Sequence, residues 1–96
     1  MTTEAEVFET LKYHVDVSPR TGTRRYYNSK GQLHREEGPA VVYSGGSCEW
    51  WQNGLRHRID GSAVEWYDGY KEWWLNGVPY TEQQYLAKII ALGHTV

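Results

Sequence analysis

Hydrophobic and polar residues alternate through the middle of the chain, in short runs separated by turn residues. Val15 and Val17 alternate with polar neighbours, and residues 40–52 and 63–75 each show the same pattern on either side of a glycine turn. A period of two residues is typical of strands with differently exposed faces. The pattern predicts antiparallel β-hairpins over residues 15–80.

The C-terminal segment follows a helical period instead. Thr81 and Gln84 have the spacing of a capping box, and Gly93 is placed to end a helix. The apolar face of this helix is formed by Tyr85, Leu86, Ile89 and Ile90. We therefore expect a helix over residues 81–93 that covers the edge of the last hairpin.

The N-terminal segment, residues 1–14, also contains a helical signal. Thr3 and Glu6 fit a capping box, and an apolar stripe is formed by Val7, Phe8 and Leu11. These residues predict a short helix over residues 3–12.

A 23-residue repeat unit occurs twice in succession, as residues 34–56 and 57–79. The two copies are identical at 11 of 23 positions, among them the opening His-Arg, the Glu-Trp-Trp run and the closing Asn-Gly. A unit this short suits two strands and two turns. The segment before it resembles an eroded copy, since Tyr26-Tyr27 precede Trp50-Trp51 by 24 residues.

Turn residues divide these units into hairpins. Asn53-Gly54, Asp68-Gly69 and Asn76-Gly77 are typical of type I′ turns, in which both central residues need a positive φ. The sequence therefore predicts one mainly β domain over residues 1–96. We expect an antiparallel hairpin meander closed by a C-terminal helix.

Five Trp and eight Tyr residues supply large side chains to both faces of this sheet. Neighbours in a strand point to opposite sides, so Trp50 and Trp73 share one face while Trp51 and Trp74 share the other. Either a helix covers one face and the other stays exposed, or a bent sheet shields both rows. Trp, Tyr and Arg are frequent interface hot spots. We expect a partner-binding surface formed by Tyr43, Trp51, Trp66 and Trp74, with Arg24, Arg25 and Arg35 as charged anchors.

A basic segment suggests a second kind of surface. Between Lys12 and Arg35 six basic residues stand against one acid, Asp16. Tyr26 and Tyr27, with the basic Arg20 and Lys30, have the composition of a nucleic-acid stacking platform. An ordinary solvated strand explains the same charges, and the pI near 6.0 is low for a nucleic-acid binder.

The repeated His-Arg element is the second candidate for function, after the paired tryptophans. His34 and His57 recur at the repeat period, but zinc sites need three or four close ligands and the chain has one cysteine, Cys48. A structural role at the bend of each unit is the simpler interpretation. No nucleophile with a base and no phosphate loop is found, so we expect no enzyme activity, metal or cofactor.

Cys48 has no internal partner for a disulfide, and no apolar stretch approaches the ~20 residues of a membrane span. The N-terminus is acidic where a signal peptide is basic. These features predict a cytoplasmic protein.

The units Gly31-Gln32-Leu33-His34-Arg35-Glu36-Glu37-Gly38-Pro39-Ala40-Val41 and Glu49-Trp50-Trp51-Gln52-Asn53-Gly54 resemble a repeat of small bacteriophage and bacterial proteins. That repeat is similar to the MORN repeat, in which single β-hairpins stack along an axis. The resemblance covers roughly residues 22–86 and departs at Ile59 and Ser62, where an acid and a proline are usual. It implies an architecture rather than an activity.

A phage-like origin implies action in the host bacterial cytoplasm. The leading hypothesis is a non-enzymatic module that binds a host protein, such as an inhibitor of a CRISPR effector or another defence complex. The alternatives are a nucleic-acid or nucleotide binder that uses residues 20–35, and a structural protein that self-associates through open sheet edges.

Overall fold

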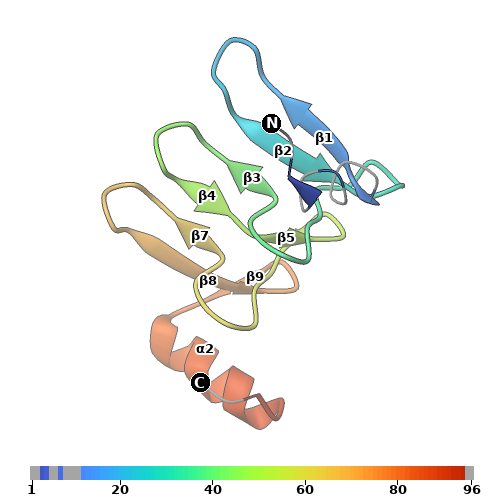
Figure 1. Cartoon of the computed structure of the whole chain (residues 1–96). Helices are drawn as coiled ribbons and strands as arrows, with labels where there is room; N and C mark the ends of the chain where they lie inside the picture. Colours follow the sequence, from blue (N-terminus) through green and yellow to red (C-terminus); the bar gives the residue numbers. More distant parts are fainter. Residues whose placement is uncertain (1–2, 5–6, 8–11, 95–96) are drawn as a thin grey trace.

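The computed structural model describes residues 3, 4, 7 and 12–94 of the chain. It is a mainly antiparallel β-structure that ends in helix α2 (Glu82–Ala91), which confirms the predicted fold class (Figure 1). The predicted N-terminal helix falls largely on residues outside the described ones. No helix among the described residues is long and apolar enough to cross a membrane.

Seven strands form one sheet in the order β1-β2-β3-β4-β7-β8-β9, and β5 and β6 pair separately. Every neighbouring pair is antiparallel. The strands are β1 (His14–Val17), β2 (Arg24–Tyr27), β3 (Val41–Val42), β4 (Cys48–Glu49), β5 (Trp51–Gln52), β6 (Leu55–Arg56), β7 (Val64–Glu65), β8 (Lys71–Leu75) and β9 (Val78–Tyr80). Figure 1 shows the hairpins stacked one behind another, with α2 after the last of them.

The first full unit bends at Trp50, inside the alternating pattern of residues 40–52 that predicted a regular hairpin. The Trp50 N–H donates to the carbonyl of Ala63 at 2.6 Å, while its own carbonyl accepts the N–H of His57 at 3.1 Å. The two backbone groups of Trp50 therefore serve different parts of the next unit. The ladder changes partner at this residue, so that β4 pairs with β3 and β7 while β5 pairs with β6.

Two kinds of turn connect the strands. Asn53 and Asn76 have φ of 50° and 49° and precede glycines that also have positive φ, which confirms the predicted type I′ turns. The prediction for Asp68-Gly69 is wrong, because only Gly69 has a positive φ. The Gly69 N–H donates to the carbonyl of Trp66, and the Trp66 N–H donates to the carbonyl of Tyr70. This is the pattern of a type I turn followed by a left-handed glycine.

Two small cores hold the stack together. Small apolar residues at the first strand of each unit, β3 or β7, are at most 2% exposed, namely Ala40, Val41, Ala63 and Val64. Helix α2 forms the second core by packing Tyr85 and Ile89 against Leu75 of β8. Its predicted capping box is present, with Thr81 as the N-cap. Ile90 was expected on the apolar face but is 61% exposed.

Candidate functional site

One face of the sheet carries a row of matched positions from successive strands. Arg25, Val41 and Glu49 lie opposite one another across β2, β3 and β4, and the row continues through β7 and β8 to Glu72. Residues directly opposite in a ladder share a face. This face therefore holds Arg25 and two matched glutamates from successive units.

Two predicted binding residues meet beside this row, at the tips of the hairpins. The rings of Tyr43 and Trp66 stack with centroids 6.0 Å apart and planes inclined by 28°. The Tyr43 hydroxyl donates to Glu49 Oε2 at 2.7 Å. Trp66 is 36% exposed, so the outer surface of this stack is open to solvent.

Glu49 links this stack to the next aromatic residue. Its side chain is 7% exposed, yet its carboxylate also accepts the indole N–H of Trp51 at 2.9 Å and lies 3.5 Å from Arg56 Nη2. A buried carboxylate requires such partners to offset its lost hydration. Glu49 thus fixes Tyr43, Trp51 and Arg56 relative to one another.

Arg56 extends the network to the following unit. Its guanidinium lies 5.2 Å from the ring centroid of Trp51 and 5.1 Å from that of Trp74, so it contacts both indoles through cation–π interactions. The Trp74 N–H donates to Glu72 at 2.8 Å, which repeats the Trp51–Glu49 contact. We call the connected surface formed by Tyr43, Trp51, Arg56, Trp66 and Trp74 the aromatic face.

The hydroxyl of Tyr43 stays a donor in this environment. Burial and the neighbouring Glu49 carboxylate raise the pKa of Tyr43 above its ordinary value of 10.0. The hydrogen bond that orients Glu49 is therefore maintained throughout the neutral range.

The three predicted arginine anchors do not gather on one surface. Arg25 shares the face of Glu49, while its strand neighbour Arg24 points to the opposite side. Arg35 lies over the buried ring of Tyr26 at 4.0 Å and donates to the Pro39 carbonyl at 3.1 Å. Arg35 therefore stabilises the bend of its unit, and only Arg25 lies on the side of the aromatic face.

The predicted nucleic-acid platform is also divided. Tyr26 is only 4% exposed and packs edge-to-face on Tyr13, so it offers no open stacking surface. Tyr27 is partly exposed on the other side of β2. Arg20 and Lys30 are exposed in the turns at opposite ends of β2. The structure thus leaves Tyr27 as the single aromatic residue of this set with an open ring.

The His-Arg element holds the bends, as the repeat period predicted. Nδ1 of His34 accepts the N–H of Asn53, and Nδ1 of His57 accepts that of Asn76, each at 3.0 Å. Arg58 lies 3.9 Å from the Trp50 ring centroid, in the arrangement that Arg35 adopts over Tyr26. Within residues 12–94 and the few described before them, no group of three His, Cys, Asp or Glu side chains is placed to bind a metal.

Cys48 shows no sign of activation as a nucleophile. Burial, followed by the charge of Glu65, raises the pKa of its thiol above the ordinary value of 9.0. A raised pKa lowers the fraction of reactive thiolate at neutral pH.

Comparison of the chain with protein-family models, curated proteins and solved structures finds no match.

Proposed function

We propose that this chain is a non-enzymatic protein-binding module whose working surface is the aromatic face. The observation that carries the proposal is the continuous network from Trp66 through Tyr43 and Glu49 to Trp51, Arg56 and Trp74. Trp, Tyr and Arg dominate the energetic centres of protein interfaces because they combine large apolar area with polar groups.

The network also reduces the entropic cost of binding. The indole N–H groups of Trp51 and Trp74 are already bonded to glutamates of their own strands. Rings fixed before binding lose little further rotamer freedom when a partner docks. The pre-ordered rings therefore favour a specific interface over a merely adhesive apolar patch.

Arg56, the charged residue of the aromatic face, is paired with the neighbouring Glu49. Contacts to a partner should accordingly depend on ring packing and be insensitive to salt. We propose as partner a protein of a host defence complex, on the resemblance of the repeat to those of small phage proteins.

The proposal predicts that Trp66→Ala weakens partner binding by about 30-fold or more, the loss of a typical hot spot. Tagged chain would first capture its partner from bacterial lysate, and titration calorimetry with the purified partner would then measure the dissociation constant. Trp66 suits this test because its ring is exposed and stacks only on Tyr43 among the described residues. Tyr67→Ala is the matched control, since Tyr67 is 80% exposed at the tip of the same hairpin.

Binding that survives Trp66→Ala would contradict the assignment of the aromatic face. So would recovery of nucleic acid alone, with an affinity that falls steeply as salt is raised, because that dependence indicates phosphate contacts. Far-ultraviolet circular dichroism and urea unfolding of both variants separate lost binding from lost folding.

A further inference from the structure

The two edges of the large sheet are closed to different degrees. At one edge, β9 contains Pro79, which has no N–H to donate, and helix α2 contacts the same strand. At the other edge, β1 contains no proline. Among the described residues no strand pairs with the outer side of β1 (Figure 1). Such an edge offers hydrogen-bonding groups to another strand.

The hydrogen-bond pattern shows which groups of β1 point outward. The Ser18 N–H donates to the Thr23 carbonyl, so Ser18 faces β2. Residues alternate along an antiparallel ladder, and therefore Asp16 and His14 also direct their backbone groups to β2. Val15 and Val17 direct theirs to the open edge.

We propose that β1 pairs antiparallel with β1 of a second copy of the chain, about a two-fold axis at Val15. Val15 then faces Val15 of the partner subunit and exchanges two backbone hydrogen bonds with it. His14 faces Asp16 of the partner subunit, and the symmetry creates this pair twice. Both are non-hydrogen-bonded positions, where cross-strand side chains approach most closely, so the imidazole and carboxylate can pair.

Charge and proline disfavour the two registers that are shifted toward the C-terminal end of β1. An axis at Asp16 would place two carboxylates opposite each other, which is destabilising. An axis at Val17 would place Val15 opposite Pro19 of the partner subunit, which lacks an N–H. The register at Val15 avoids both costs and pairs each Asp16 with a His14.

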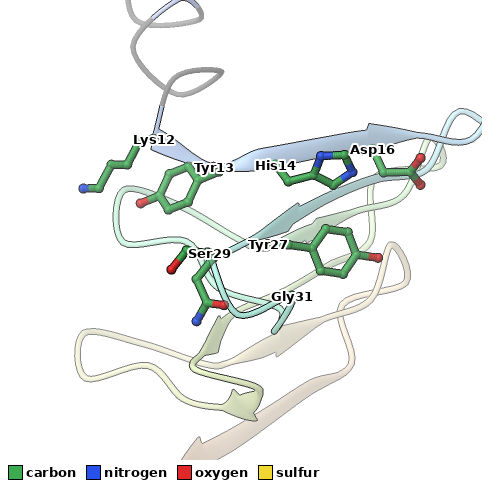
Figure 2. A pocket seen from close by; sticks show the side chains of 8 residues that line it. Lys12, Tyr13, His14, Asp16, Tyr27, Ser29 and Gly31 are labelled. Atoms are coloured by element: carbon green, nitrogen blue, oxygen red, sulfur yellow. The ribbon is translucent and has the colours of Figure 1, made fainter.

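The surface beside β1 has room for this contact. An open depression of about 700 Å³ lies beside β1 and is lined by Tyr13, His14, Asp16 and Tyr27, among other residues. Figure 2 shows these four side chains. The His14 ring lies 5.9 Å from that of Tyr27, over the depression rather than across the outer edge of the strand. Backbone groups of an approaching strand can therefore reach those of Val15.

The blocked β9 edge limits the assembly to two copies. A β1-to-β9 contact would propagate into a fibre, whereas a β1-to-β1 contact uses the same patch on both subunits and closes at once. Strands of four residues form a small interface, so we expect a dimer that dissociates at about 10 µM or above. The contact does not involve the aromatic face and stands independently of the proposed function.

Sedimentation velocity of the full chain from about 10 µM to about 1 mM tests the proposal. The apparent mass should rise from the 11.2 kDa monomer toward twice that value. His14→Asp and Asp16→His should each weaken the dimer at least tenfold, because each places like groups opposite one another. The double variant His14→Asp/Asp16→His exchanges the two members of the pair and should restore dimerisation.

Glu82→His on α2 is the control, since it changes the net charge as Asp16→His does but lies away from β1. It should dimerise like the wild type. Monomer at every concentration, or dimerisation unaffected by either single variant, would overturn the proposal. A double variant that folds but fails to recover the dimer would overturn the Val15 register.

Discussion

At the scale of single residues, a histidine holds the bend of each unit. The Nδ1 atom of His57 accepts the N–H of Asn76, which has a left-handed φ of 49°. Burial lowers the pKa of His57 below its ordinary value of 6.5. Folding therefore favours the neutral imidazole, which can accept this hydrogen bond, over the imidazolium, which cannot.

The free energy of unfolding should consequently fall in mild acid. In the unfolded chain His57 is protonated near its ordinary pKa of 6.5, whereas in the folded chain it is protonated only at a lower pH. The contribution of His57 to the free energy of unfolding is therefore complete above pH 6.5. It is lost as the pH falls through the lower pKa of the folded chain. Urea unfolding from about pH 7.5 to about pH 5 should show a smaller pH slope for His57→Gln than for the wild type. At the upper pH the variant should be about 1 kcal/mol less stable. Equal slopes would show that His57 does not control this dependence.

Part of the aromatic face follows from sequence, and part depends on the stacking of units. Alternation along a strand places Trp51 and Trp74 on one face, and the Asn53-Gly54 turn sets Arg56 opposite Trp51. The second contact of Arg56, with Trp74, arises only when one unit packs on the next. Comparing the two units does not reveal this contact, because the position that matches Arg56 in the following unit is Pro79.

At the scale of elements, a buried tyrosine from outside each unit completes its bend. Tyr13 lies just before β1, and its hydroxyl accepts the N–H of Glu36 at 2.9 Å. The Tyr85 hydroxyl of helix α2 accepts the N–H of Gly61 at 3.2 Å and donates to the carbonyl of Arg58 at 2.6 Å. Helix α2 is therefore positioned by hydrogen bonds as well as by apolar packing.

Removing the hydroxyl of Tyr85 should destabilise the chain by about 1–3 kcal/mol. Tyr85 is 2% exposed, so Tyr85→Phe leaves two backbone groups without a partner where water has little access. Tyr80→Phe is the control, because Tyr80 packs against the same core and its hydroxyl makes no hydrogen bond among the described residues. Urea unfolding measures both changes. Equal losses in the two variants would contradict the hydrogen-bonding role of Tyr85.

The order of hairpins and the C-terminal helix could be predicted because local residues specify them. Asn-Gly turns and the Thr81 capping box act within a few positions of the chain. The break at Trp50 could not be predicted, since it depends on hydrogen bonds with His57 and Ala63 in the following unit. Neither Tyr13 nor Tyr85 carries a repeat signal, because both lie outside the two full copies.

At the scale of the whole molecule, the chain is a short array in which each unit bonds to its neighbour. The Gly54 N–H donates to Leu33 and the Gly77 N–H to Arg56, each at 2.9 Å. Within each unit, the N–H groups of Arg35 and Arg58 donate to the carbonyls of Trp51 and Trp74, each at 3.2 Å. Stability in such arrays is approximately a sum of unit and neighbour contributions.

An added unit should therefore be accommodated. A second copy of residues 34–56 placed after Arg56 reproduces the natural Arg-His junction. We expect the stack to lengthen by about 10 Å, two strand spacings, with stability equal or higher. Small-angle scattering and thermal unfolding measure the two effects. The same insert between Gly45 and Gly46 is the control, because it lies at a hairpin tip and cannot join the stack. Loss of cooperative unfolding in the in-register protein would contradict the array model.

The position of helix α2 after the last unit affects how a gene for such a repeat protein can change in length. The helix rests on β8 and β9 and bonds the bend of the last unit, so it is needed only where the array stops. Recombination that copies one unit in frame leaves this terminal segment intact and yields a longer folded product. A deletion that removes the terminal segment uncovers Leu75. Selection should thus tolerate changes in the number of internal units more readily than loss of helix α2.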